Sequence, residues 1–208
     1  MKKAIILDLD NTIYPVSSIA ETLFNPLFEL IDEYRDIMDE ADIESALYQI
    51  TRRPYQFVAD ECNFPEELKI KGVELLKNIE YHLPMHPYDG YEHLKTVNLK
   101  KFLVTTGFSK LQWSKIKMLD IKADFDEIHI VDPEVSTRSK KDVFEDIMKR
   151  HYYTSVDLLV IGDDPESEIK AAKLLGIDTF LYDPEDKHPN VVVTYRNKHL
   201  KNSLEHLR

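Results

Sequence analysis

Two carboxylates follow the first apolar run of the chain. Asp8 and Asp10 come directly after Ala4–Leu7, which we interpret as a buried strand of a parallel sheet. An extended backbone points alternate side chains to one side, so we expect both carboxylates to project into one small volume. Two close carboxylates repel unless a cation lies between them, and Mg²⁺ prefers oxygen ligands. The spacing therefore indicates a magnesium site, with a solvated acidic turn as the alternative.

A second acidic cluster ends another apolar run. Leu158–Ile161 is followed by Gly162, Asp163 and Asp164, with Glu168 four residues further on. If this strand lies beside the first, both clusters meet at the carboxyl ends of the strands, where open parallel sheets bind ligands. We assign Asp163 to the metal. Asp164 and Glu168 either support it or cap the following helix, because acidic residues favour the first turn of a helix.

The elements that would position these residues alternate between strand and helix. Short apolar runs recur along the chain and are separated by intervals long enough for a helix, which is typical of βαβ units. The pattern predicts an α/β fold with a doubly wound, Rossmann-like parallel sheet. The expected strands are 4–7, 102–104, 128–131, 158–161 and 179–182, and the expected intervening helices are 109–119, 142–150 and 166–175.

One long segment interrupts this alternation. Residues 14–88 contain no convincing strand, and their apolar residues recur at steps of three and four, which indicates helices. We therefore expect a helical insert over 14–88 and a catalytic core made of 1–13 and 89–208. A last helix is expected over 195–208. Within the insert, the expected helices are 19–38, 43–50 and 65–79.

Composition narrows the class of protein. The chain has 208 residues, with 27 basic and 38 acidic side chains and a net charge of −11, so nucleic acid and anionic membrane surfaces are poor partners. Cys62 is the single cysteine, which excludes an internal disulfide and fits a reducing cytoplasm. The first apolar run is too short for a signal peptide or a membrane span. We expect a cytoplasmic monomer or homodimer.

Four short motifs in order along the chain resemble those of the haloacid dehalogenase-like superfamily. Each is weak alone, but together they cover nearly the whole chain, and that superfamily places a helical cap where the insert lies. The motifs are Asp8-Leu9-Asp10-Asn11-Thr12, Val104-Thr105-Thr106-Gly107, Lys140 or Lys141, and Gly162-Asp163 followed by Glu168.

The resemblance implies a covalent mechanism of phosphoryl transfer. Asp8 would be the nucleophile that forms an aspartyl-phosphate. Asp10 would protonate the leaving oxygen and then activate water. Asp8, Asp163 and the backbone carbonyl of Asp10 would hold Mg²⁺. The second aspartate distinguishes phosphatases from the dehalogenases of the superfamily, which lack it.

The resemblance also implies a phosphate clamp. Thr105, with Thr106 beside it, and a lysine would hold the phosphoryl oxygens by hydroxyl donation and by charge. Lys140 lies four residues before Phe144, an expected core position, so we place the motif lysine at Lys140 and keep Lys141 as the alternative.

The function expected from these residues is a Mg²⁺-dependent phosphatase that hydrolyses a small phosphorylated metabolite, either a nucleotide or a sugar phosphate. The residues around Tyr14 look most like the branch that contains pyrimidine 5′-nucleotidases. A phosphomutase shares every motif, and a catalytically idle binding or regulatory protein would keep the same fold. Both remain alternatives.

Four residues are candidates for contact with the rest of the substrate. Tyr14 leaves the first strand where the insert begins, and Arg52, Arg53 and Tyr55 form a small basic and aromatic group within the insert. Arginine could bind a second anionic group and tyrosine could stack on a base. Exposed arginine and packed tyrosine are the alternative interpretation.

Overall fold

The computed structural model describes residues 1–51 and 53–208. Its centre is a six-stranded sheet in the order β3-β2-β1-β4-β5-β6, with every pair of neighbours parallel. The expected α/β fold with a doubly wound parallel sheet is confirmed. The strands are β1 (Ala4–Leu7), β2 (Lys100–Thr106), β3 (Glu127–Val131), β4 (Leu158–Gly162), β5 (Asp178–Tyr182) and β6 (Tyr195–Asn197).

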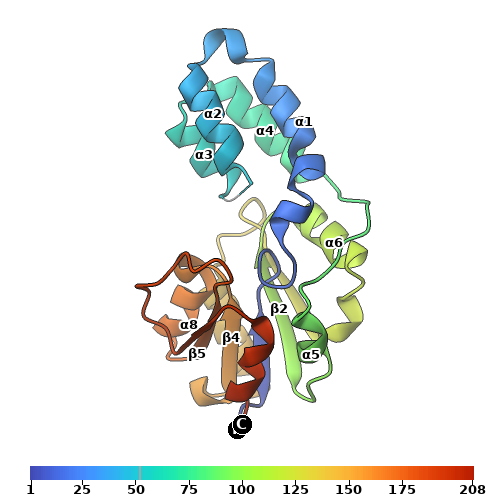
Figure 1. Ribbon diagram of the computed structural model, residues 1–208, viewed down its shortest axis with the longest axis vertical. Coiled ribbons are helices and arrows are strands. Elements are labelled where there is room, and N and C mark those ends of the chain that lie inside the picture. The colour runs from blue at the N-terminus through green and yellow to red at the C-terminus, as the bar shows by residue number, and fades with distance from the viewer. Residues whose placement is uncertain (52) are drawn as a thin grey trace.

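Helices cover both faces of the sheet (Figure 1). Alternate residues of β1 point to opposite faces: Leu7 packs with α6, and Ile6 packs with α7. Burial on both faces explains why β1 is a continuous apolar run. The helices of one face are α5 (Tyr91–Lys95) and α6 (Ser109–Met118), and those of the other are α7 (Lys140–His151) and α8 (Lys170–Leu174).

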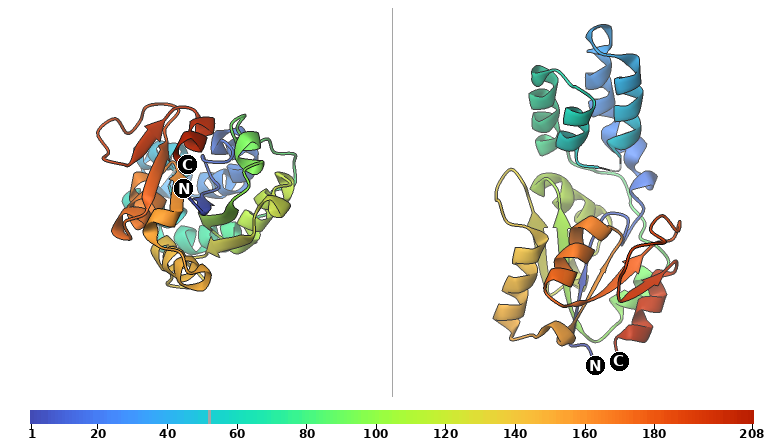
Figure 2. Two further views of the ribbon diagram at one scale, coloured as in Figure 1. Left: turned by 90° about the horizontal axis from the view of Figure 1, so that it is seen from below. Right: turned by 90° about the vertical axis from the view of Figure 1, so that its left-hand side faces the viewer.

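Five α-helices lie between β1 and β2 in the described part of the sequence, and the first four of them lie beyond the carboxyl ends of the strands (Figures 1 and 2). The helix expected over 19–38 is shorter than predicted and ends at Asp32. The helix around the Arg53–Tyr55 group was not predicted. The four are α1 (Ala20–Asp32), α2 (Glu40–Gln49), α3 (Tyr55–Glu61) and α4 (Glu66–Asn78).

The end of the chain differs from the expected helix. Tyr195–Asn197 pairs with β5 as the edge strand β6, and only Leu200–His206 coils, as a 3₁₀ helix. The two termini lie together, because the Lys2 amide donates to the Leu207 carbonyl at 3.0 Å (Figure 2). Among residues 1–51 and 53–208, no helix combines the length and the apolar character that crossing a bilayer requires.

Candidate active site

The two acidic clusters meet at the carboxyl ends of β1 and β4. These strands are paired, with Leu7 opposite Ile161, and the Asp8 amide donates to the Ile161 carbonyl at 3.0 Å. Carboxylate oxygens of Asp8, Asp163 and Glu168 all lie within 4.8 Å of one another. Adjacent parallel strands that end at one edge therefore bring together acids that are far apart in the sequence.

Lys140 neutralises part of this cluster. It is the first residue of α7, which begins with a capping box formed by Ser139 and Asp142. Its Nζ lies 2.7 Å from Asp8 Oδ1 and 2.7 Å from Glu168 Oε2. Lys141 instead pairs with Glu145 on the outer side of the helix. The cap of α7 thus directs Lys140, and not Lys141, into the cluster.

Glu168 is held against the backbone of the β4 end. Its Oε1 accepts the Asp164 amide at 2.8 Å, and a Cβ built on Gly162 would lie 2.1 Å from that oxygen. Glycine is needed at 162 because the carboxylate occupies the space of a side chain. The carboxylate of Asp164 accepts the Glu166 amide and caps the following turn, which agrees with the capping alternative for Asp164.

Asp10 has different immediate partners from Asp8. The strand ends at Leu7, Leu9 lies in a bend, and Asn11 has φ 55°. The Asp10 carboxylate is absent from the group that Asp8 forms with Asp163 and Glu168. The charge of Asp10 nevertheless adds to the rise in the pKa of Asp8, so the two carboxylates act on each other, and their meeting at one reacting group stays a prediction.

Asp10 faces α6 instead. Lys115 donates to Asp10 Oδ1 at 2.8 Å, Gln112 donates to Oδ2 at 2.9 Å, and the Tyr14 hydroxyl also donates to Oδ1. Sequence reasoning missed Gln112 and Lys115. The signal was present, because both polar side chains fall on a helix face shared with Ile116, which is directed into the core.

Burial and charge set the protonation of these acids. Burial raises the pKa of Asp8 to about 7, with Lys140 opposing and Glu168 adding to that rise. Burial, followed by Glu168 and Asp8, raises the pKa of Asp163 well above its ordinary value. Burial alone would also raise the pKa of Asp10, but the charge and hydrogen bonds of Lys115 hold it below its usual range.

The donor set fits a hard divalent cation. The cluster presents the carboxylate oxygens of Asp8, Asp163 and Glu168 against one buried ammonium group, that of Lys140. Such an excess of negative charge keeps acids protonated unless a cation compensates it. Mg²⁺ takes oxygen ligands and is usually held by one or two carboxylates together with substrate phosphate.

The family is decided by a match along most of the chain. A family model for haloacid dehalogenase-like hydrolases matches residues 2–176. The chain belongs to the haloacid dehalogenase-like hydrolase family. The resemblance inferred from the four motifs is confirmed.

Individual relatives are distant in sequence. Glyceraldehyde 3-phosphate phosphatase of Methanocaldococcus jannaschii is 24% identical over 195 residues, covering 86% of this chain and 84% of the relative. The HAD-hydrolase YfnB of Bacillus subtilis, solved with bound magnesium, has a TM-score of 0.67 at 20% identity, covering 100% of this chain and 99% of that one. SP0104 of Streptococcus pneumoniae has a TM-score of 0.72 at 18% identity, covering 100% and 99%. Both structures share the fold of this hydrolase.

The two threonines at the end of β2 in this family member have different surroundings. Thr105 is buried, and its Oγ1 accepts a hydrogen bond from Gln112 at 2.7 Å. Thr106 is exposed and lines a groove of about 680 Å³. Lys140 and Arg138 also line this groove, and Phe57 of α3 lines it from the helical segment. Sequence reasoning missed Phe57, an aromatic residue that is 62% exposed.

Three of the four candidate substrate contacts lie among the described residues, and each has partners within the protein. Tyr14 is fully buried and bonded to Asp10. Tyr55 packs in the core of the helical segment and donates to the Leu68 carbonyl at 2.7 Å, so the prediction that it stacks on a base is wrong. Arg53 pairs with Glu61 at 2.6 Å. Arg52 lies outside the described residues.

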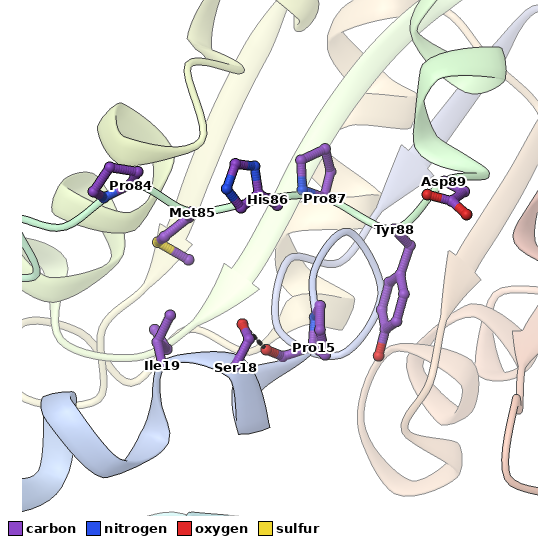
Figure 3. Close-up of a pocket in the computed structure, with 9 residues that line it drawn as sticks. All are labelled: Pro15, Ser18, Ile19, Pro84, Met85, His86, Pro87, Tyr88 and Asp89. Carbon is purple, nitrogen blue, oxygen red and sulfur yellow. Dashed lines mark hydrogen bonds between the residues drawn. The ribbon is translucent and has the colours of Figure 1, made fainter.

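Two chain connections join the helical segment to the sheet. They run beside each other, because the Tyr88 amide donates to the Ile13 carbonyl at 2.7 Å. Between them is a cleft of about 350 Å³, lined by Pro15, Ser18 and Ile19 from one connection and by residues 84–89 from the other (Figure 3). Two adjacent backbone segments therefore connect the helical segment to the sheet.

Proposed function

We propose that this hydrolase is a Mg²⁺-dependent phosphatase that hydrolyses a small phosphomonoester through an aspartyl-phosphate. The observation that carries the proposal is the buried cluster of Asp8, Asp163 and Glu168 with Lys140 at the carboxyl edge of the sheet. Family membership supports hydrolysis, and the relatives named as glyceraldehyde 3-phosphate phosphatases support a small phosphorylated substrate.

Asp8 is the proposed nucleophile. Lys140 bonds Asp8 Oδ1, whereas Oδ2 accepts no hydrogen bond from the described residues. In the first step Oδ2 forms a bond to phosphorus while the bond to the leaving oxygen breaks. In the second step water attacks phosphorus, and the Asp8 carboxylate is released with inorganic phosphate.

Asp10 is the proposed acid and base. It protonates the leaving oxygen in the first step and accepts a proton from the attacking water in the second. Lys115 favours the ionised form, which suits the second step. The negative charge of an arriving phosphate raises the pKa of a nearby carboxyl group, and this favours the protonated form needed first.

The proposed metal ligands are Asp8, Asp163 and the backbone carbonyl of Asp10. When bound, Mg²⁺ would neutralise the repulsion between the Asp8 carboxylate and the phosphate. Lys140 and the Thr105 hydroxyl would hold phosphoryl oxygens, with Thr106 at the entrance. Glu168 would position Lys140, and Asp164 would hold Glu168 through its amide.

The helices α1–α4 are the proposed cap, covering 14–88 between the two parts of the catalytic core. Their position beyond the carboxyl ends of the strands supports this role (Figure 1). The substrate is a nucleotide or a sugar phosphate, and the resemblance to pyrimidine 5′-nucleotidases stays a prediction. Localisation in the cytoplasm and assembly as a monomer or homodimer also stay predictions.

Asp8→Asn tests the nucleophile. We expect release of inorganic phosphate from p-nitrophenyl phosphate to fall at least about 10³-fold, because an amide oxygen is a far weaker nucleophile than a carboxylate. Circular dichroism and thermal unfolding check that the fold remains. Undiminished release of phosphate by the variant would refute the assignment of Asp8. Consumption of p-nitrophenyl phosphate by the wild type without release of inorganic phosphate would favour a phosphomutase.

Removal of metal tests the cofactor. We expect chelator to abolish activity and Mg²⁺ to restore it. As a second measurement, Mg²⁺ should raise the Tm of the wild type, because a ligand that binds only the folded state stabilises it, and the Asp163→Asn variant should lose most of this rise. A chelator-insensitive enzyme with an unshifted Tm would exclude the metal site.

A further inference from the structure

We propose that Gln112 and Lys115 of α6 are positioning residues of the reaction. Together they fix the carboxylate of Asp10 and set the direction in which the Thr105 hydroxyl donates. The inference rests on the proposed function, because it requires that Asp10 exchange protons with the substrate and that Thr105 bind a phosphoryl oxygen.

Lys115 is a buried cation whose ammonium group pairs with the Asp10 carboxylate. Its side chain is 6% exposed, and among the described residues its only hydrogen-bond partner is Asp10 Oδ1 at 2.8 Å. Its Nζ also lies 5.9 Å from the centre of the Tyr14 ring. Burying an ammonium group is costly, and apolar residues in place of a buried ion pair are often equally stable. Core packing therefore does not explain why a lysine occupies position 115, whereas the need to hold the Asp10 carboxylate in one orientation does.

Gln112 connects Asp10 to the phosphate clamp. Its amide nitrogen carries two hydrogens, and its two shortest contacts are Thr105 Oγ1 at 2.7 Å and Asp10 Oδ2 at 2.9 Å. A third contact, to the Thr106 carbonyl, is longer at 3.2 Å. Because the Thr105 hydroxyl accepts from Gln112, its own hydrogen is left for another acceptor. No described residue takes that hydrogen, which leaves it for a phosphoryl oxygen.

The turn between β2 and α6 brings this amide close. Gly107 has φ 151°, and a Cβ there would lie 3.1 Å from the Gln112 side-chain carbon Cδ. Gln112 and Lys115 are three residues apart, so one helix face presents both toward Asp10. A single rigid element thus holds the proton-exchanging carboxylate and the phosphate-binding hydroxyl in one arrangement.

The experiment compares Lys115→Met and Gln112→Ala with Lys117→Met, an exposed lysine of the same helix. Steady-state kinetics are measured with p-nitrophenyl phosphate, which has a good leaving group, and with glycerol phosphate, which has a poor one. We expect K115M to lower kcat about 10- to 100-fold with KM within about 2-fold, since general acid–base catalysis contributes about 10²- to 10⁴-fold. The loss should be larger for glycerol phosphate, whose leaving oxygen needs the proton most.

The other variants separate positioning from simple destabilisation. Q112A should lower kcat and also raise KM about 5-fold, because the Thr105 hydroxyl loses its partner. Lys115→Arg should recover part of kcat, since it restores a charged donor, and K117M should match the wild type. If K115M, Q112A and K117M had equal kinetics on both substrates, the inference would be overturned and the proposed function would stand. A wild type that releases no phosphate from either substrate would refute the proposed function, and the inference with it.

Discussion

At the scale of the residue, the clearest case is the choice between two adjacent lysines. Lys140 is 7% exposed and bonds both Asp8 and Glu168, whereas Lys141 lies on the outer side of α7 beside Glu145. The spacing to Phe144, which is fully buried, predicts this register. The two lysines have the same chemistry and differ only in the direction given by the helix.

Lys140→Met and Lys141→Met form a matched pair. We expect K140M to lower kcat/KM about 10²- to 10³-fold, because a charged donor to the phosphoryl oxygens is lost. It should also lower stability, since Asp8 and Glu168 are left as buried acids without their cation. K141M should have a much smaller effect than K140M, because Lys141 lines the same groove but pairs with Glu145 and does not contact the acidic cluster. If K141M had the larger effect, the motif lysine would be Lys141 and not Lys140.

At the scale of the element, β3 and α7 are joined by one carboxylate. Glu127 of β3 accepts two hydrogen bonds from Arg150, at 2.8 and 2.6 Å, and one from His151 at 2.6 Å. Its own strand contributes His129 at 2.9 Å. Arg150, then His151 and His129, lower the pKa of Glu127 to about 2. The carboxylate thus ties the end of α7, the helix that carries Lys140, to the sheet.

Glu127→Gln should destabilise the fold in a pH-dependent way. The folded pKa lies below the ordinary value of 4.5, so the ionised group stabilises above about pH 4.5 and this contribution is lost as the pH falls toward about 2. Because the side chain is 24% exposed, we expect about 1 kcal/mol at neutral pH after solvent screening. Urea unfolding from pH 7 to pH 3 measures the difference.

The control for this prediction is Glu145→Gln, on the outer side of the same helix. Its pair with Lys141 is exposed, so we expect a change below about 0.5 kcal/mol. If the gap between wild type and E127Q stays constant across this pH range, the ionised form of Glu127 is not what stabilises the contact.

At the scale of the whole molecule, the helices between β1 and β2 reach the groove beside Lys140. Phe57 of α3 is 62% exposed and lines this groove with Thr106, Arg138 and Lys140. An exposed aromatic ring that shares a groove with the proposed phosphate-binding groups is suited to contact the part of a substrate that does not react. We therefore expect Phe57 to contribute to substrate affinity.

Phe57→Ala should raise KM about 5- to 20-fold and leave kcat within about 3-fold, because uniform binding of substrate and transition state is lost. Ile70→Ala is the control, since Ile70 is 60% exposed on α4 and does not line the groove. The comparison uses the best substrate from a panel of nucleotides and sugar phosphates. An unchanged KM for F57A would place the substrate elsewhere.

Much of the sheet and the position of the acidic cluster follow from the sequence by itself. Apolar runs specify strands that are covered on both faces, and parallel strands end at one edge, so Asp8 and Asp163 are predicted to meet. Tertiary structure alone decided which groups surround Asp10 and that Tyr55 is buried. Gln112 and Lys115 are 102 and 105 residues away from Asp10. Periodicity records which way a side chain faces within its own element, whereas a contact between elements depends on how those elements pack.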